Sequence, residues 1–246
     1  MKWEKFEESF LREKPHEKGS EQRRIEKEVF DEFTADTVWK LARKGYLDYL
    51  GGVVSTGKEA NVFKGWNRDG VAKAYKIYRI ETSNFQSMWE YIEGDRRFEH
   101  VRPVKRHIVL AWCQKELKNL QTAHRAGCRV PKPVFSLNNI LIMQFIGGEF
   151  GAPLLKDVEL DEPSQVYDLL AEDMKKLYAA GLIHADLSEF NVLWWQEKPW
   201  IIDIGQGVPL SHPKADDFLK RDCENVGKYF KKLGVDTKGL YEQITG

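Results

Sequence analysis

Hydrophobic and polar positions follow different patterns in the two halves of the chain. Residues 53–80 are rich in β-branched and aromatic types, and an Asn-Arg-Asp-Gly sequence at 67–70 divides them. This pattern predicts an antiparallel hairpin or meander. A second apolar run, 134–146, is interrupted by two asparagines at 138–139 and predicts two more strands.

Other segments have the period of an α-helix, with apolar residues recurring every three or four positions. Residues 108–126 show this period, and Gly127 fits the position that follows a helix. Residues 161–180 form a second such segment, which begins with Asp161 and Pro163 and stops at Gly181. A last helix is expected over about 213–233.

The amino-terminal part has a weaker pattern. Residues 1–35 are dominated by charge and are interpreted as an accessory segment, with a helix over 22–33. Asp36 is expected to cap a further helix that ends at Gly51 and Gly52. Residues 81–100 are expected to hold a loop and a helix.

The order of the elements, strands first and helices second, predicts the class of fold. It indicates an α+β protein with two lobes and a cleft between them. The expected boundaries are an accessory segment at 1–35, an N-lobe with its preceding helix at 36–143, and a C-lobe at 144–246.

Composition narrows the class of protein. Among the 246 residues, 31 % are charged and 42 % are hydrophobic, which excludes a wholly disordered chain. The 38 basic and 38 acidic residues cancel, so global charge does not indicate nucleic-acid binding. No apolar stretch is long enough for a transmembrane helix, and the three scattered cysteines favour a reduced, cytoplasmic protein.

A glycine-containing loop follows the first predicted strand and has three interpretations. Residues 52–58 fit the first seven positions of a Walker P-loop, but Glu59 replaces the hydroxyl residue that holds Mg²⁺. Residues 55–62 fit the glycine loop of kinases if Ser55 and Ala60 replace the outer glycines. There Ser55 adds a hydroxyl donor and Lys58 a cation; an ordinary hairpin turn is the third interpretation.

The strand after this loop carries a candidate phosphate-binding lysine. Ala-Tyr-Lys-Ile at 74–77 resembles the V-A-I-K motif of kinases. Lys73 and Lys76 are both candidates, and strand alternation favours Lys76. Glu116, on the predicted helix 108–126, is a candidate acidic partner, or a solvated helix charge.

Two further motifs carry the chemistry of phosphoryl transfer. Residues 184–191, HADLSEFN, match the kinase catalytic loop H-x-D-L-x-x-x-N, in which Asp186 orients the incoming hydroxyl and Asn191 reaches a Mg²⁺. Asp203 in Asp-Ile-Gly matches D-F-G and supplies a second metal ligand. Because all these elements occur in kinase order, chance resemblance is a poor explanation. His184 is expected to be a buried orienting group.

These motifs resemble the RIO family of atypical protein kinases. STGKEANV, HADLSEFN, IIDIGQ, APLL and FLKRDC carry the resemblance, which runs from about Asp36 to Leu233, and STGKEA is typical of the type 1 subfamily. The resemblance implies a bilobal protein-kinase-like fold that lacks the activation loop and peptide-docking helices. Asp186 and Asp203 would then be catalytic, with Asn191 and Asp203 as ligands of Mg²⁺ or Mn²⁺.

The resemblance also implies the remainder of an ATP site. The residues expected to contact ATP, or to position those that do, are Ser55, Lys58, Lys76, Glu116, Met143, Gln144 and Ile146. Of these, Met143 would lie at the back of the adenine pocket, and the backbone of Gln144 and Ile146 would bind the adenine edge. Asp203 could accept a phosphoryl group transiently.

Family members act in maturation of the small ribosomal subunit, as kinases or ATPases, so this chain is expected to do the same. A pre-ribosomal particle is the expected partner, with rRNA contact through the basic segment 96–107, including Phe98 as a stacking residue. Ala185 and Ser188 replace residues of ordinary kinases, and no A-P-E sequence follows Asp203. The alternatives are a catalytically weak, nucleotide-gated assembly factor and a Walker-type ATPase.

Overall fold

The structure, a computed structural model, describes residues 9–11, 29–81 and 85–246. The chain divides into two compact units that share the polypeptide in alternation. Unit 1 comprises the described residues of 1–86, 102–114 and 134–145; unit 2 comprises those of 87–101, 115–133 and 146–246. In the part of the chain that the structure describes, none of the helices is long and apolar enough to cross a membrane.

Unit 1 is built on a five-stranded sheet with the order β1-β2-β3-β5-β4. β1 and β2 are antiparallel, as are β2 and β3, and β3 pairs antiparallel with β5. The predicted meander is therefore confirmed, as are the two strands around 138–139. The strands are β1 (Tyr49–Thr56), β2 (Ala60–Trp66), β3 (Ala72–Tyr78), β4 (Pro133–Leu137) and β5 (Ile140–Gln144).

The turn between β2 and β3 forms where the sequence predicts it. The side-chain oxygen Oδ1 of Asn67 accepts from the backbone N–H of Val71 at 2.9 Å, and Gly70 has a φ of 72°. Gly65 admits a close approach, because a Cβ there would lie 2.6 Å from Cε2 of Tyr75. The hydroxyl of Tyr75 in turn donates to the carbonyl of Tyr46 at 2.7 Å.

Helix α3 (Glu32–Arg43) differs from its prediction at both ends. Its cap is Asp31, whose carboxylate accepts from the N–H of Thr34 at 2.7 Å. Asp36 instead lies inside the helix and pairs with Lys40 at 2.6 Å. The expected end at Gly51 and Gly52 is also wrong, because both lie in strand β1.

Gly45 explains where that helix ends. It has a φ of 81°, and its N–H donates to the carbonyl of Ala42 at 3.0 Å. Val38 and Leu41 of α3 are buried in one cluster with Phe63, Tyr75 and other sheet residues, so α3 belongs to the core of unit 1. The predicted helix over 22–33 lies mostly outside the described residues.

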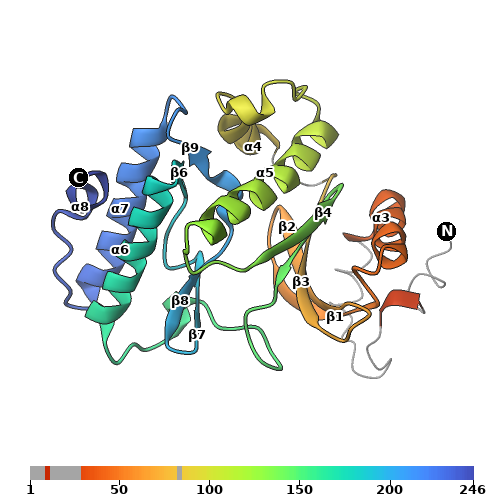
Figure 1. The fold of residues 1–246 in the computed structure, drawn as a ribbon, viewed down its shortest axis with the longest axis horizontal. Helices are drawn as coiled ribbons and strands as arrows, with labels where there is room; N and C mark the ends of the chain where they lie inside the picture. Colours follow the sequence, from red (N-terminus) through yellow and green to blue (C-terminus); the bar gives the residue numbers. More distant parts are fainter. Residues whose placement is uncertain (1–8, 12–28, 82–84) are drawn as a thin grey trace. The chain divides into compact units, whose positions relative to one another are not determined.

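Unit 2 is mainly helical, and α6, α7 and α8 lie side by side (Figure 1). Pro163 opens α6, and Gly181, with a φ of 78°, follows its end, as the sequence predicts. Two small sheets, β6-β9 and β7-β8, carry the loops described below. The helices that lie wholly or partly in unit 2 are α4 (Phe85–Ile92), α5 (Lys105–Arg125), α6 (Pro163–Ala179), α7 (Ala215–Lys232) and α8 (Leu240–Thr245).

Short elements complete unit 2. Between Asp203 and the start of α7 at Ala215, the chain forms only a 3₁₀ turn and a two-residue strand. A long activation segment therefore has no room before α7. The short elements of unit 2 are η1 (Arg96–Phe98), η2 (Leu155–Asp157), η3 (Ile204–Gln206), β6 (Leu182–Ile183), β7 (Val192–Trp195), β8 (Lys198–Ile201) and β9 (Val208–Pro209).

Candidate active site

In unit 1, the glycine loop joins two antiparallel strands. Ser55 is exposed near the end of β1, and Lys58 is exposed in the loop itself. The N–H of Gly57 donates to the carbonyl of Ala60 at 2.9 Å, and a Cβ on Gly57 would lie 3.0 Å from that oxygen. Since the loop leads into strand β2 and not into a helix, the Walker alternative does not fit the structure.

The two candidate lysines of β3 have different environments. Lys76 is 7 % exposed, opposite Val62 on one neighbouring strand and Leu141 on the other. Its ammonium lies 5.3 Å from the ring centroid of Tyr78. Lys73 is half-buried near the start of the strand. A buried ammonium requires compensating interactions, which favours a functional role for Lys76 over Lys73.

The other expected nucleotide contacts are distributed over both units. Met143 and Gln144 end strand β5 in unit 1, with Met143 buried and Gln144 half-buried. Ile146 is buried in unit 2, and so is Glu116 on α5. The pairing of Lys76 with Glu116 stays a prediction.

In unit 2, the catalytic loop places Asp186 and Asn191 in contact. The amide nitrogen Nδ2 of Asn191 donates to the backbone carbonyl of Asp186 at 2.7 Å and to its carboxylate Oδ2 at 3.1 Å. Ala185, just before the aspartate, has a φ of 67°, so the chain turns sharply there. His184 is buried, with its ring nitrogen Nε2 3.0 Å from the carbonyl oxygen of Ile202, which agrees with an orienting role.

A buried carboxylate that the sequence analysis did not single out supports this loop. Asp222 of α7 accepts from the N–H groups of Ala185 and Leu187, both at 2.8 Å. It therefore holds the backbone on both sides of Asp186. Burial raises the pKa of Asp222 to about 7, against the two N–H groups that favour its charged form.

Its neighbour Arg221 also contacts the loop. The guanidinium donates to the carbonyl of Ala185 and, at 3.3 Å, to the hydroxyl of Tyr91. Both α7 residues occur in the FLKRDC motif. Their roles were not predictable from spacing, because their partners in the loop lie 35 to 37 positions earlier in the sequence.

Neighbouring groups shift the pKa of Asp186 in opposite directions. Burial raises its pKa, the hydrogen bond from Asn191 lowers it, the negative charge of Asp203 raises it, and the positive charge of Arg221 lowers it. The net direction is upward. The charge interaction also indicates that Asp186 and Asp203 lie near one another within unit 2.

Asp203 is exposed and has an unusual backbone. Its φ of 57° lies in the left-handed region, which a non-glycine residue occupies only when its surroundings enforce it. The turn η3 follows directly. An exposed carboxylate on a fixed turn is suited to reach a ligand.

The donor set in unit 2 fits a magnesium ion that is also bound by phosphates. With Nδ2 of Asn191 committed to Asp186, the amide oxygen remains to face a cation, and Asp203 adds a carboxylate. Mg²⁺ prefers oxygen ligands and is commonly held by one or two carboxylates plus substrate phosphates. No group of three or more His, Cys, Asp and Glu side chains among the described residues could hold a metal alone.

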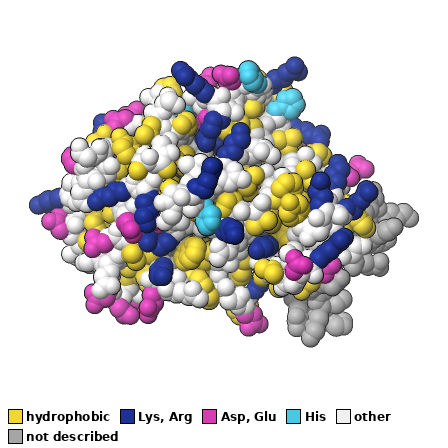
Figure 2. Space-filling view, in the orientation of Figure 1, with side chains coloured by type: hydrophobic (Ala, Val, Ile, Leu, Met, Phe, Trp, Pro, Cys, Tyr) yellow, Lys and Arg dark blue, Asp and Glu magenta, His cyan; other side chains and the backbone are white. Residues whose placement is uncertain are grey.

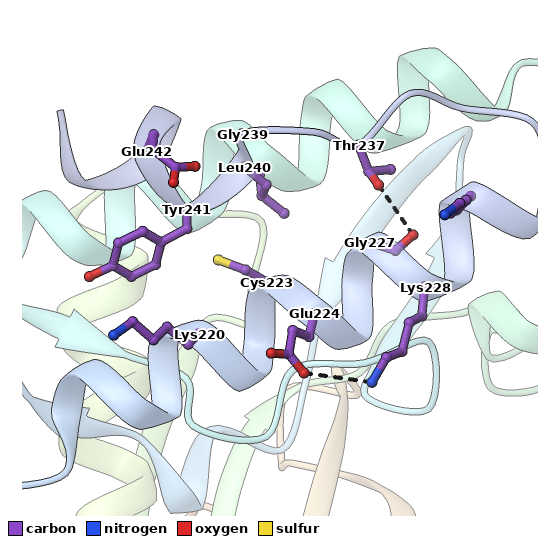
Figure 3. A pocket seen from close by; sticks show the side chains of 11 residues that line it. Lys220, Cys223, Glu224, Gly227, Lys228, Thr237, Gly239, Leu240, Tyr241 and Glu242 are labelled. Carbon is purple, nitrogen blue, oxygen red and sulfur yellow. Dashed lines mark hydrogen bonds and ion pairs between the residues drawn. The ribbon is translucent and has the colours of Figure 1, made fainter.

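A separate pocket of about 490 Å³ lies between α7 and α8 in unit 2 (Figure 3). Two of the lysines that line it have acidic partners: Lys228 lies 3.6 Å from Glu224, and Lys220 lies 2.7 Å from Asp216. None of the predicted site residues lines it. We therefore do not assign the nucleotide to this pocket.

A sheet unit with a glycine loop and a buried strand lysine, and a helical unit with the H-x-D and D-x-G loops, define a protein-kinase-like protein. Solved structures of the Rio2 kinase from Chaetomium thermophilum have this fold. Its ADP/Mg²⁺-phosphoaspartate complex matches with a TM-score of 0.66, covering 86 % of this chain and 65 % of that one at 20 % identity. A second Rio2 structure gives 0.65, with 85 % and 67 % covered at 21 % identity.

Sequence comparison then gives the family. The family model described as RIO domain matches residues 61–243. The RIO-type serine/threonine-protein kinase Rio1 of Haloferax volcanii is 44 % identical over 93 % of this chain and 80 % of its own length. Rio1 of Methanocaldococcus jannaschii is 40 % identical over 89 % and 76 %. The chain therefore belongs to the RIO family, type 1 subfamily, and is an atypical serine/threonine protein kinase.

Eukaryotic relatives are longer than the matched region. Human serine/threonine-protein kinase RIO1 is 36 % identical over 89 % of this chain, which spans only 40 % of that protein's length. The family model and these relatives confirm the predicted family, and the solved Rio2 structures confirm the predicted fold class.

Proposed function

We propose that this kinase uses Mg-ATP to phosphorylate serine or threonine, with ATP hydrolysis as a competing outcome. The arrangement of Asp186 and Asn191 carries the proposal, because it holds a carboxylate and an amide oxygen on one rigid loop. Asp186 orients the acceptor hydroxyl. Asn191 and Asp203 hold Mg²⁺ or Mn²⁺, which would neutralise the charge of the phosphate oxygens.

The remaining predicted residues are assigned to ATP on their motif positions or, for Met143, Gln144 and Ile146, on the family resemblance alone. Ser55 and Lys58 contact the triphosphate, and Lys76 binds the α- and β-phosphates and is held by Glu116. Met143, Gln144 and Ile146 contact the adenine. The burial of Lys76 and the exposure of Ser55 and Lys58 support these roles.

ATP turnover with variants at the two aspartates tests the proposal. Asp186→Ala and Asp203→Ala should each lose Mg²⁺-dependent turnover by at least about 10²-fold, because each removes a group that acts on the reacting atoms. Asp217→Ala, at an exposed position of α7, is the matched control and should keep the parent rate. Parent-like turnover in either active-site variant would refute the assignment.

The second candidate is a nucleotide-gated assembly factor with little chemistry. Ala185 and Ser188 favour it, because Ala185 replaces the arginine of the H-R-D motif and Ser188 replaces a lysine that serine/threonine kinases often carry two residues after the catalytic aspartate. ATP binding without turnover in the parent protein would support this candidate over the first.

Asp203 could take the phosphoryl group from ATP before water or a hydroxyl does. In that step a carboxylate oxygen of Asp203 attacks the γ-phosphorus, the bond to the β–γ bridging oxygen breaks, and ADP leaves. The solved Rio2 structure is an ADP/Mg²⁺-phosphoaspartate complex of that kinase, which supports the same step here. Single-turnover labelling with γ-labelled ATP, with the labelled residue identified as aspartate or serine, distinguishes the routes.

The proposed partner is a precursor of the small ribosomal subunit in the cytoplasm, reached in part through the basic segment 96–107. Arg96 and Arg102 are exposed and suited to contact phosphates. Arg97 is occupied, with its guanidinium 2.7 Å from the buried carboxylate of Asp95. The expectation that Phe98 stacks on a base is wrong, because Phe98 is buried and Lys118 lies 4.8 Å from its ring centroid.

A further inference from the structure

Two buried side chains of α5 contact the turn that follows Asp203. Lys115 and Asn119 are four residues apart and so lie on one face of the helix, and both are completely buried. The ammonium of Lys115 donates to the carbonyls of Gly205 at 3.1 Å and Gln206 at 3.2 Å, and also to that of Gly207. All these residues belong to unit 2.

Asn119 completes the set of donors. Its Nδ2 donates to the carbonyls of Ile204 at 2.9 Å and Gly207 at 2.7 Å. Consecutive carbonyls from 204 to 207 are thus bound by two side chains of one helix. A Cβ on Gly207 would lie 2.9 Å from Nδ2 of Asn119, so a glycine is needed to admit this contact.

The chemistry of the two side chains matches what the turn requires. Buried carbonyl groups need hydrogen-bond donors, and a lysine ammonium offers three. The left-handed φ of Asp203 also needs surroundings that enforce it. A hydrophobic side chain at 115 would leave several buried oxygens unsatisfied next to that strained residue.

Two charged residues, Arg97 and Asp95, form a network with the side chain of Asn119. The carboxamide oxygen of Asn119 accepts from Arg97 at 2.8 Å, and Arg97 is paired with Asp95. Burial lowers the pKa of Lys115 to about 7, while the charge of Asp95 raises it and that of Arg97 lowers it. Burying an amine at such a site costs free energy, which indicates that Lys115 has a specific role there.

We infer that Lys115, together with Asn119, is a positioning residue for Asp203: the two side chains fix the carbonyls of 204–207 and thereby keep the Asp203 carboxylate aimed at the metal. This inference rests on the proposed role of Asp203 as a metal ligand. Neither Lys115 nor Asn119 touches the metal or the nucleotide in this assignment. Their effect is on the affinity for the ion.

Manganese binding in the presence of ADP tests the inference without relying on turnover. Bound Mn²⁺ is measured by electron paramagnetic resonance with the full chain. Lys115→Met should weaken Mn²⁺ binding to the ADP complex by about 10- to 100-fold, as expected for loss of a group that orients a metal ligand. Lys115→Arg should restore part of it, and ADP affinity in EDTA should stay unchanged.

Lys118→Met is the control, because Lys118 lies on the exposed part of the same helix. It should bind Mn²⁺ as the parent does. If Lys115→Met fails to fold, Asn119→Ser is measured in the same way and should show the same loss. Parent-like Mn²⁺ affinity in a folded variant overturns the inference, even if that variant is thermally destabilised.

Asp203→Asn separates the inference from the proposed function. If this variant binds Mn²⁺ with ADP as well as the parent does, the proposed metal role itself is wrong. If it loses binding while Lys115→Met and Asn119→Ser keep it, only the positioning role fails.

Discussion

At Asp186, burial and the charge of Asp203 favour the neutral acid, whereas Asn191 and Arg221 favour the carboxylate. In its proposed role, the same residue must be ionised to orient a hydroxyl. Its environment therefore links the pH range of activity to neighbours that do not touch the substrate.

The first prediction concerns the pH dependence of kcat/KM. Because the pKa of Asp186 is raised above its ordinary value of 3.8, activity should fall on acidification at a pH above that value. Arg221→Leu removes a positive charge that lowers this pKa, so the acid limb should move to higher pH. Arg221→Lys keeps the charge and should move it less.

A pH–rate profile of the parent protein, Arg221→Leu and Arg221→Lys at saturating Mg²⁺ measures the position of the acid limb. An acid limb that stays in place in Arg221→Leu, or that moves to lower pH, would contradict the assigned charge effect.

The second prediction concerns Asp222, which accepts two backbone hydrogen bonds. Asp222→Asn has one acceptor oxygen in place of two, so an N–H of Ala185 or Leu187 would face an NH₂ group. Leaving a buried donor unsatisfied should lower the free energy of unfolding by about 1–3 kcal/mol and also reduce turnover. Urea denaturation and ATP turnover measure the two effects.

The exposed Asp217 provides the comparison. Asp217→Asn should leave turnover unchanged and lower the free energy of unfolding by no more than about 0.3–1 kcal/mol, because its charge lies in the first turn of α7. If Asp222→Asn were as stable and active as the parent, the catalytic loop would not depend on this carboxylate.

At the scale of elements, helix α3 shows that a capping residue is identified by its contacts. Asp31 and Asp36 are both aspartates near the start of an amphipathic run. Only Asp31 lies in extended backbone with its carboxylate on the N–H of Thr34. Asp36 makes an exposed pair with Lys40 instead.

The third prediction compares these two aspartates. Asp31→Ala should lower the free energy of unfolding by about 1 kcal/mol, as for loss of a helix cap. Asp36→Ala should change it by less than about 0.5 kcal/mol, because an exposed i,i+4 pair contributes little. Chemical denaturation of both variants measures the difference, and equal effects would show that Asp31 does not act as the cap.

For the whole molecule, charge is balanced in number but distributed in segments. Lys and Arg side chains are interspersed with Asp and Glu on the face in Figure 2, in line with 38 basic and 38 acidic residues. Any attraction to RNA must then come from local basic segments.

The fourth prediction applies this to the basic segment 96–107. Arg96→Glu combined with Arg102→Glu should weaken binding to a small-subunit rRNA precursor. It should also reduce the slope of log K against log salt by roughly 0.7–0.9 for each phosphate that the protein no longer neutralises. Filter binding over a range of salt concentrations measures both effects.

Lys175→Glu combined with Lys198→Glu makes the same change in charge at exposed positions outside the segment. This control should bind more tightly than the Arg96 and Arg102 variant. Equal weakening in both would indicate a general charge effect without a defined RNA surface.

The local sequence pattern alone was sufficient to predict many of the secondary-structure elements and the loop that carries Asp186 and Asn191. The turn at 67–70, the strands around 138–139, Pro163 and Gly181 at the ends of α6, and the motif at 184–191 all act through neighbours in sequence. Turn residues and helical periodicity act over a few residues, and the spacing of Asp186 and Asn191 is set within the single loop 184–191. Such features are therefore visible without coordinates.

Interactions between residues far apart in the sequence could be identified only from the tertiary structure. Lys115 meets its carbonyl partners 90 to 92 positions later, and Asp222 binds a loop 35 to 37 positions earlier. In the sequence both residues resemble ordinary charged positions on amphipathic helices. Their roles arise because folding buries them beside backbone groups that no local pattern connects to them, and because a buried charge must find partners wherever the chain brings them.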